Sequence, residues 1–415
     1  MQIGIVGLGY VGLPLAVAFA EAGHEVVGLD TDPGRLAELR AGHSYVEDVP
    51  DAVLAPLTDR LTTTDRYADL RPCDAVILCL PTPLKSSREP DLGYVVGSAN
   101  SVARELREGQ LVVLESTTYP GTTRETLLPI LEGSGLQVGS GFHLAFSPER
   151  IDPGRTDFTL REVPKVVGGV TAACAERARA LYGTICNEVV VVSTPEAAEL
   201  AKLLENIFRS VNIALVNELS QLCDRLQIDI WEVIDAAATK PFGFMRFEPG
   251  PGMGGHCLPV DPFYLAFKAR EADFYPEFVE LAGKVNQTQP EFCVDRIARA
   301  LNDRGKSVRG SEVLILGVSY KPGIGDTRES PALKIISRLR KLGASVAYYD
   351  PHVPELKELG LSCVSLEDAL SVADLAAIVT AHPELDYEAV VAAAALVIDF
   401  RGVTRGLSAE NLQRL

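Results

Sequence analysis

The sequence predicts an α/β protein in which two doubly wound, parallel-sheet domains are joined by a long-helix connector. Three observations predict this class. Short apolar runs alternate with helical stretches over residues 1–192, long helical periodicity replaces them over residues 193–300, and the alternation returns over residues 301–415. A chain of 415 residues is also too long for one hydrophobic core, so we expect three domains with these bounds.

The composition excludes several classes of protein. Hydrophobic residues make up 47% of the chain and charged residues 23%, which is typical of a folded protein with large apolar cores. The 56 acidic residues outnumber the 39 basic ones, and the formal net charge of −17 repels nucleic acid and anionic membrane surfaces. We therefore expect neither nucleic acid nor a membrane among the partners.

The eight cysteines are scattered along the chain, with no C-x-x-C pair and no Cys/His spacing typical of a metal site. We expect no bound metal, and reduced thiols fit a cytoplasmic protein. The first twenty residues carry no charge, but they lack the basic region of an export signal, and Gly7, Gly9, Gly12 and Pro14 would interrupt any membrane span. This segment is better interpreted as a buried strand, a turn and a helix.

The first elements make one βαβ unit. A strand is expected over residues 1–6, a glycine turn over 7–12, a helix over 14–22 that ends at Gly23, and a second strand over 25–29. Further buried strands are expected at residues 75–80, 111–115, 143–146 and 188–192 and, in the last domain, at residues 312–316, 345–349, 375–380 and 396–400.

The connector is expected to be helical with one interruption. Helical periodicity runs over residues 195–238 and resumes from residue 263 to about residue 300. Between these stretches, residues 240–262 are dense in glycine and proline and cannot form regular structure. We therefore expect a long loop inside the helical segment.

A G-x-G-x-x-G pattern follows the first strand and opens the first helix. Gly7 permits the tight turn, Gly9 lets backbone N–H groups approach a pyrophosphate, and Gly12 lets helix and strand pack closely. Tyr10 and Val11 complete the turn, and the helix N-terminus supplies a site for the anion. A glycine turn that serves packing alone is the alternative. The context favours a Rossmann-like domain that binds a dinucleotide.

Asp30 stands at the end of the second strand. A carboxylate at this position accepts hydrogen bonds from the ribose diol of adenosine. NAD is therefore favoured over NADP, because a 2′-phosphate would meet the same carboxylate. Thr31 and Asp32 offer no arginine next to it, although Arg35 could still reach.

Cys257 is the one cysteine whose surroundings argue for chemistry. It lies in the irregular segment after two glycines, which leave room for a substrate, and four residues before Asp261, whose carboxylate could act as a base or orient water. A buried cysteine in a structural loop is the alternative. His256 adjoins Cys257, but adjacent side chains of an extended segment point in opposite directions, so we expect His256 to be a rim residue.

Two further pairs of polar residues are candidates. Lys202 and Asn206 lie four residues apart on a helical stretch and share one face, where an inward ammonium and carboxamide could stabilise an oxyanion. A solvent-facing pair of no consequence is the usual outcome, and spacing does not decide between the two. Lys321 and Arg328 flank glycines after the first strand of the last domain and are interpreted either as phosphate contacts or as a charged surface turn.

Taken in order, these motifs resemble the nucleotide-sugar dehydrogenase family, the UDP-glucose and GDP-mannose 6-dehydrogenase group. The resemblance covers nearly the whole chain. Its pieces are the turn from Gly7, Pro81-Thr82-Pro83, Glu115-Ser116-Thr117, Ser147-Pro148-Glu149-Arg150, Lys202 with Asn206, the segment from Gly254 to Asp261, and the segment from Lys321 to Ser330.

The resemblance implies an enzyme that oxidises a primary alcohol of the sugar to a carboxylate with two NAD⁺ in sequence. Cys257 would capture the aldehyde as a thiohemiacetal, which loses a second hydride to give a thioester that water hydrolyses. Lys202 and Asn206 would stabilise the oxyanion, and Asp261 would assist proton transfer or activate water.

The same resemblance implies the binding residues and the assembly. Thr117 and Glu149 would position or activate water, with the division of roles among Lys202, Asp261 and Glu149 left open. The connector would lie at the interface of a homodimer. The residues implied for NAD are Gly7, Gly9, Tyr10, Val11, Gly12, Asp30, Arg35, Thr82, Thr117 and Arg328. Those implied for the substrate are Glu149, Arg150, Lys202, Asn206, Gly254 and Lys321.

One departure points to the sugar. The UDP-glucose and GDP-mannose branches commonly have lysine before the motif aspartate, whereas this chain has Val260, with His256 before the cysteine. This pattern resembles the branch that oxidises UDP-N-acetylhexosamines, with UDP-N-acetylglucosamine the first choice and UDP-N-acetylmannosamine the second. UDP-glucose, or a non-catalytic sensor that binds NAD and a nucleotide sugar, are the alternatives.

Overall fold

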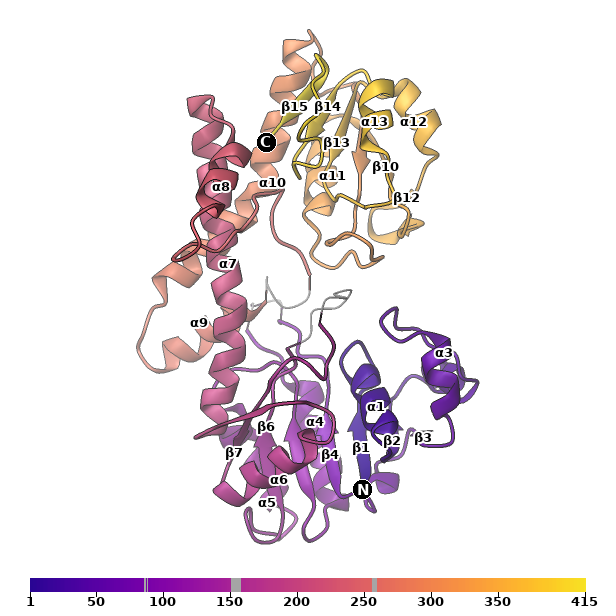
Figure 1. The fold of residues 1–415 in the computed structure, drawn as a ribbon, viewed down its shortest axis with the longest axis vertical. Helices are drawn as coiled ribbons and strands as arrows, with labels where there is room; N and C mark the ends of the chain where they lie inside the picture. The colour runs from indigo at the N-terminus through magenta and orange to yellow at the C-terminus, as the bar shows by residue number, and fades with distance from the viewer. Residues whose placement is uncertain (86, 88, 151–157, 256–259) are drawn as a thin grey trace. The chain divides into compact units, whose positions relative to one another are not determined.

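The computed structural model describes residues 1–85, 87, 89–150, 158–255 and 260–415. The chain forms two compact units. The first comprises Met1–Glu205 and Phe263–Tyr275, and the second comprises Asn206–Pro262 and Pro276–Leu415. Each unit is built around one sheet with helices against it (Figure 1). Helix α7 (Pro195–Leu226) contributes residues to both units.

The first unit contains an eight-stranded sheet with the order β3-β2-β1-β4-β5-β6-β7-β8. All neighbouring pairs are parallel except β6 and β7, which are antiparallel. The order of the first six strands is that of a doubly wound, dinucleotide-binding sheet. The strands are β1 (Gln2–Val6), β2 (Glu25–Leu29), β3 (Leu61–Thr64), β4 (Ala75–Leu78), β5 (Leu111–Leu114), β6 (His143–Phe146), β7 (Lys165–Gly169) and β8 (Val189–Val192).

Two strands of this sheet are not predicted by the sequence. Three of the four residues of β3 are threonines, and β7 begins with Lys165 and ends with two glycines, so neither strand is an apolar run. The other six strands lie where the sequence predicts them, with ends that differ by at most two residues. Hydrophobic periodicity misses strands that lack a continuous apolar run.

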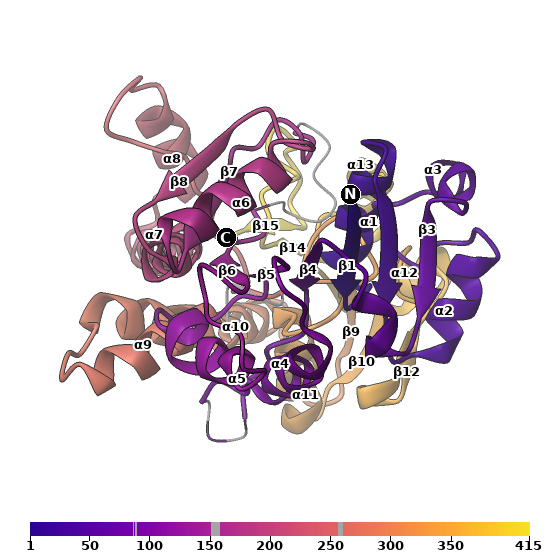
Figure 2. The same cartoon turned by 90° about the horizontal axis from the view of Figure 1, so that it is seen from below.

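Helices cover both faces of this sheet, as Figure 2 shows. Successive residues of a strand point to opposite faces. Accordingly, Ile77 of β4 joins the buried cluster with α1 and α6, whereas Val76 and Leu78 join the cluster with α4 and α5. The helices are α1 (Gly12–Glu21), α2 (Pro33–Arg40), α3 (Asp51–Leu54), α4 (Gly93–Glu105), α5 (Leu128–Glu132) and α6 (Ala172–Tyr182).

The helical segment differs from its prediction in two places. The stretch expected over residues 195–238 is divided into α7 and α8 (Ile230–Ala238), because Gln227 adopts a left-handed conformation (φ 56°) and the Asp229 carboxylate caps the second helix. Helix α9 (Asp261–Glu271) begins inside the stretch expected to be irregular, and α10 (Glu277–Asp303) follows it. None of the described helices combines the length and the apolar character that a membrane span requires.

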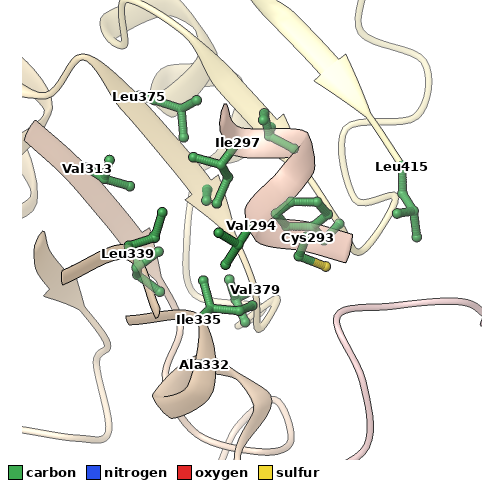
Figure 3. Close-up of a cluster of buried hydrophobic side chains, with 14 of the residues drawn as sticks. Cys293, Val294, Ile297, Val313, Ala332, Ile335, Leu339, Leu375, Val379 and Leu415 are labelled. Atoms are coloured by element: carbon green, nitrogen blue, oxygen red, sulfur yellow. The ribbon is translucent and has the colours of Figure 1, made fainter. Parts of the chain in front are cut away.

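The second unit contains a five-stranded parallel sheet with the order β10-β9-β13-β14-β15. Helix α10 packs on one face through Cys293, Val294 and Ile297, together with Ile335 of α11 (Figure 3). Helices α12 and α13 pack on the other face, so this sheet is doubly wound as predicted. The short strand β15 is not predicted, since its three residues are only partly buried.

The elements of the second sheet and its cover are short. They are α11 (Pro331–Leu342), α12 (Leu366–Val372), α13 (Tyr387–Ala393), β9 (Glu312–Leu316), β10 (Ser345–Tyr349), β13 (Leu375–Ile378), β14 (Val397–Asp399) and β15 (Leu412–Arg414), with an antiparallel pair of β11 (Glu355–Leu356) and β12 (Leu361–Ser362) beside them.

Candidate active site

The predicted residues of the first unit gather at one edge of its sheet. Gly7 follows β1, Asp30 follows β2, Thr82 lies beyond β4, Thr117 beyond β5 and Glu149 beyond β6. These five strands run parallel, so their carboxyl ends share an edge. Ligands of open α/β sheets bind outside this edge. The fold therefore brings residues that are far apart in the sequence to the position where a ligand is expected.

The three glycines of the turn differ in how much space a side chain would have at each position. Gly7 has a φ of 92°, and a Cβ there would lie 2.4 Å from the carbonyl oxygen of Cys79. A Cβ on Gly12 would lie 1.8 Å from the carbonyl oxygen of Gly7, whereas a Cβ on Gly9 would meet no atom within 4 Å. Packing therefore accounts for Gly7 and Gly12. At Gly9 the missing side chain instead leaves open space in which a ligand can approach the backbone.

Asp30 fixes the turn to the end of β2. Its side chain is buried, its Oδ2 accepts a hydrogen bond from the Leu8 N–H (2.9 Å), and its Oδ1 accepts one from the Asp32 N–H (3.0 Å). The carboxylate therefore holds the glycine turn in shape in addition to any contact with a ribose. This structural role is one that the sequence does not reveal.

Arg35 lies close to Asp30, a contact that the sequence allows but does not establish. Its Nη1 lies 3.6 Å from Asp30 Oδ2, and its guanidinium lies over the Tyr45 ring, 5.3 Å from the centroid. The residues fit the adenosine end of NAD: the backbone is open at Gly9, a carboxylate stands at the strand end, and a hollow lies beside the turn. This hollow has a volume of about 330 Å³, and its lining includes Gly9, Tyr10, Asp32, Arg35 and Tyr45.

Thr82 and Thr117 are in direct contact. Thr82 Oγ1 donates a hydrogen bond to the carbonyl oxygen of Thr117 (2.8 Å). The Tyr264 hydroxyl of α9 donates to the carbonyl oxygen of Thr82 (2.6 Å) and is fully buried. These bonds join the segments after β4 and β5 to α9. Tyr264 is a site residue that the sequence does not single out.

A buried charged cluster consists of Glu115, Glu149, Lys165 and Tyr182. The Lys165 ammonium lies 3.0 Å from Glu115 Oε2 and 3.4 Å from Glu149 Oε2, and the Tyr182 hydroxyl donates to Glu115 Oε1. Burial raises the pKa of Glu115, although Lys165 opposes this shift. Burial alone would lower the pKa of Lys165, but the two carboxylates outweigh it and raise that pKa. Hydrophobic periodicity gives no signal for this cluster, because Lys165 begins a strand that is not an apolar run.

The segment after β6 is also tied to α7. Arg150 donates to the carbonyl oxygen of Pro164 (2.6 Å) and forms an ion pair with Glu205 of α7 (2.8 Å). On the same helix Lys202 is 9% exposed and Asn206 1%, so their shared face points inward and the solvent-facing alternative is wrong.

In the second unit the structure brings Asn206 and Asp261 together. Asn206 Nδ2 donates to Asp261 Oδ2, and Arg209 donates to Asn206 Oδ1. Asp261 is the first residue of α9 and is 2% exposed. The amide of Asn206 is thus oriented from both ends. Arg209 lies one helical turn from Asn206 and is a further residue that the sequence does not single out.

The segment that leads to Cys257 is anchored on the loop after β9. The Gly255 N–H donates to the carbonyl oxygen of Arg328 (3.0 Å), and a Cβ on Gly254 would lie 2.6 Å from Tyr320 Cβ. Gly254 is therefore required for this close packing, as well as being near the predicted nucleophile. Cys257 and its neighbour His256 lie outside the described residues.

The loop after β9 carries Lys321 and Arg328. Arg328 Nε lies 2.9 Å from Asp326 Oδ2, so the guanidinium is held by a carboxylate of its own loop. Ser319 Oγ donates to the carbonyl oxygen of Lys321 (2.9 Å), which fixes the start of the loop. The two predicted cations thus lie on one loop that also supports the segment before Cys257.

At the carboxyl edge of the second sheet, the carboxylate of Asp350 is buried and surrounded by hydrogen-bond donors. Asp350 Oδ2 accepts from the Val318 N–H (2.7 Å) and lies 3.0 Å from His382 Nε2, and both side chains are fully buried. The Gly323 N–H donates to His382 Nδ1 (3.2 Å), so Nε2 carries the proton that His382 donates to Asp350. Among the described residues, His352, His382 and Glu384 have donor atoms close enough together to hold a metal ion. A metal there would have to displace one of the hydrogen bonds of His382, because both of its ring nitrogens are engaged.

Glu199 anchors the start of α7 to the segment after β5. Its carboxylate accepts from the Gly121 N–H (2.6 Å), the Thr123 N–H (2.9 Å) and Thr123 Oγ1 (2.7 Å). The side chain is fully buried. Burial raises the pKa of Glu199 to about 7, although these hydrogen bonds oppose the shift. The helix that carries Lys202 is therefore tied to the segment that carries Thr117.

This raised pKa predicts a pH-dependent stability. The folded chain binds the proton of Glu199 more tightly than the unfolded chain, whose pKa is near the ordinary 4.5. The stabilisation is complete below about pH 4.5 and is lost as the pH rises to about 7, a change on the order of 3 kcal/mol. The free energy of unfolding, measured with urea at pH 5.5 and at pH 8, should fall more between these two pH values in the native protein than in Glu199→Gln. Equal falls would contradict the prediction.

Glu196→Gln is the matched control for this measurement. Glu196 lies on the same turn of α7, but its ion pair with Arg124 holds its pKa below the ordinary value despite burial. The contribution of Glu196 to the free energy of unfolding is therefore constant above pH 5.5. We expect this variant to show the same fall in stability between pH 5.5 and 8 as the native protein.

The fold and the site together define a dinucleotide-dependent oxidoreductase with two doubly wound units. The open backbone at Gly9, the carboxylate at Asp30 and the polar residues at the carboxyl edge carry this assignment. The chain belongs to the UDP-glucose/GDP-mannose dehydrogenase family. The family's NAD binding, central and UDP binding domains match residues 1–186, 196–288 and 314–406. The protein is therefore an NAD-dependent nucleotide-sugar dehydrogenase.

Relatives with different substrates resemble the chain. It is 38% identical over 359 residues to a UDP-N-acetyl-D-glucosamine 6-dehydrogenase of Pseudomonas aeruginosa, covering 85% of this chain and 83% of that protein. It is 37% identical over 388 residues to a UDP-N-acetyl-D-mannosamine dehydrogenase of Pyrococcus horikoshii, covering 92% and 90%. A solved structure of the UDP-D-ManNAc dehydrogenase from Pyrococcus horikoshii matches with a TM-score of 0.92 and 34% identity, covering 100% of this chain and 99% of that one.

Proposed function

We propose that the protein oxidises the C6 hydroxyl of a UDP-N-acetylhexosamine to the uronic acid, with UDP-N-acetylglucosamine favoured and UDP-N-acetylmannosamine second. The contact between Asn206 and Asp261 carries the proposal, because it joins an oxyanion-stabilising amide to the carboxylate four residues after Cys257. The relatives named for these two sugars support the substrate class. The pattern of Val260 with His256 supports the same branch.

The chemistry balances as two successive oxidations. Bound NAD⁺ would supply the hydride acceptor for both of them. The C6 alcohol first loses a hydride and a proton to become an aldehyde. The Cys257 thiolate then adds to the aldehyde carbon, and the resulting oxyanion takes up a proton to give the thiohemiacetal. The thiohemiacetal loses that proton and the second hydride to become a thioester. Water gives up one proton as it attacks the thioester carbon, the thiolate leaves, and the carboxylic acid loses a second proton to become the carboxylate product.

Residues around this reaction supply charge and orientation. The buried ammonium of Lys202 and the amide of Asn206 stabilise the oxyanion of each tetrahedral species. Asp261 orients the amide and accepts or returns a proton. Thr117 and Glu149, at the ends of β5 and β6, position the water that releases the product.

The remaining binding roles follow the same reasoning. Tyr10, Asp30 and Arg35 border the adenosine end of NAD, and Thr82 and Thr117 continue along the same sheet edge. Other residues proposed to contact NAD or the nucleotide sugar are Gly7, Gly9, Val11, Gly12, Arg150, Gly254, Lys321 and Arg328.

We also propose a homodimer with α7 at its interface. Exposed apolar residues recur three, four or seven positions apart on this helix, so they form one stripe. A contiguous apolar stripe of this length is typical of a surface that another chain covers. The residues of the stripe are Leu204, Phe208, Leu215, Leu219, Leu222 and Leu226.

A substrate panel tests the proposed function. NADH release would be measured with UDP-N-acetylglucosamine, UDP-N-acetylmannosamine, UDP-glucose and GDP-mannose at several concentrations. We expect kcat/KM for UDP-N-acetylglucosamine to be the highest, and to exceed that for UDP-glucose by a factor on the order of 100 or more, because a pocket built for the acetamido group leaves polar groups unpaired around glucose. A preference for UDP-glucose or GDP-mannose would contradict the proposal.

A further inference from the structure

The direction of β7 brings a lysine to the catalytic edge of the first sheet. In the antiparallel ladder, Ala145 pairs with Gly169 and Phe146 with Gly168. Each step forward along β6 is a step back along β7, so the same register places residue 149 opposite residue 165. A parallel β7 would have put its first residue at the other edge of the sheet. The reversal of one strand thus explains why Lys165 lies beside Glu149.

We propose that Lys165 is a positioning residue that holds the Glu149 carboxylate in its ionised form and in a fixed orientation. The side chain of Lys165 is 5% exposed, and those of Glu115 and Glu149 are 0% and 15% exposed. A buried ammonium attracts both carboxylates strongly at distances of 3.0 and 3.4 Å. Lys165 therefore favours the ionised form of Glu149, whereas Glu115, as a like charge, opposes it.

Three side chains beside Lys165 and the two carboxylates, those of Cys79, Tyr182 and Cys186, are neutral near pH 7. Burial raises the pKa of the Cys79 thiol and of the Tyr182 hydroxyl well above their ordinary values. Burial likewise raises the pKa of Cys186 to about 11, even though Lys165 opposes the shift. Arg150 donates its backbone N–H to Glu149 (2.7 Å), while its guanidinium contacts Pro164 and Glu205. Among the residues that the structure describes, Lys165 and Glu115 are therefore the charged side chains of the cluster that act on Glu149.

This inference rests on the proposed function, in which Glu149 must be ionised to position or activate water. An ionised carboxylate is a better proton acceptor and a better hydrogen-bond acceptor for water than a protonated one. Protonation of Glu149 should therefore define the acid limb of the pH profile of acid formation. Lys165 shifts that limb to lower pH without touching the substrate.

Charge-changing variants test the inference through the pH profile. Lys165→Met should move the acid limb of the profile of kcat against pH to higher pH, by about one unit or more. Lys165→Arg, which keeps the positive charge, should return the limb to its native position. Glu115→Gln, which removes the opposing charge, should move the limb downward. Lys268→Met is the matched control, since Lys268 also pairs with two carboxylates, those of Glu125 and Glu271. It should leave the limb unchanged.

The outcomes separate this inference from the proposed function. Should Lys165→Met fail to fold, Glu115→Gln still decides, because a limb that stays in place in that variant overturns the proposal. Carboxyl ¹³C NMR gives a readout that needs no turnover. The resonance that is lost in Glu149→Gln should titrate at lower pH in Glu115→Gln than in the native protein. An inactive native protein with this NMR shift would contradict the proposed function and leave the role of Lys165 standing.

Discussion

Replacement of Cys257 by serine is expected to lower the rate of uronic acid formation by a factor on the order of 10³ or more. A serine hydroxyl is a far weaker nucleophile than a thiolate at neutral pH, and an ester would replace the thioester that water must hydrolyse. Uronic acid and NADH would be quantified over time with UDP-N-acetylglucosamine. An acid-forming rate within tenfold of the native rate would contradict covalent catalysis by Cys257.

Cys363→Ser is the matched control for this replacement. The Cys363 thiol is half-buried, accepts a hydrogen bond from the Asp350 N–H (3.4 Å) and donates one to the Asp350 carbonyl oxygen (3.4 Å). A serine hydroxyl can form both bonds. We expect this variant to retain the native rate, which would attribute the loss in Cys257→Ser to position and not to the removal of a thiol.

Alanine at Gly12 is expected to destabilise the protein by several kcal/mol, whereas alanine at Gly9 should leave stability within about 0.5 kcal/mol of native. In Gly12→Ala the new Cβ would overlap the carbonyl oxygen of Gly7 at 1.8 Å, which only a shift of the backbone can relieve. At Gly9 the Cβ meets open space in the protein, and the clash arises only with a bound dinucleotide. Urea unfolding and NAD titration measure the two effects.

The two glycine variants should therefore separate folding from binding. Gly9→Ala should keep the native unfolding midpoint and lose NAD affinity by a factor of about ten or more, because Gly9 lets the backbone approach the pyrophosphate. Gly12→Ala should lose stability even without NAD. Unchanged NAD affinity in Gly9→Ala would contradict the assignment of the turn to the cofactor.

The parts of the fold that the sequence predicts are those with one dominant signal. The apolar runs of β2 and β9 predict strands whose bounds the structure confirms, since a strand buried on both faces is apolar along most of its length. The reversal of β7 leaves no trace in hydrophobic periodicity. Lys165 and its partners could therefore not be placed from the sequence.

The candidate site shows the same division. A local pattern reveals the turn at Gly7, and helical spacing indicates the shared face of Lys202 and Asn206. Contacts between distant segments carry no such signal. The bond from Asn206 to Asp261 joins residues 55 positions apart, and it forms because α9 begins at Asp261, inside a stretch whose glycines and prolines predict only a loop.

Counting the NADH released per UDP-N-acetylglucosamine consumed tests the central claim most directly. The proposed sequence of alcohol, aldehyde, thioester and carboxylate requires two hydride transfers for each sugar. Substrate-limited reactions with excess NAD⁺ should therefore yield two NADH and one uronic acid per sugar, with no free aldehyde. A yield of one NADH with an accumulating aldehyde or ketone would contradict the two-step oxidation.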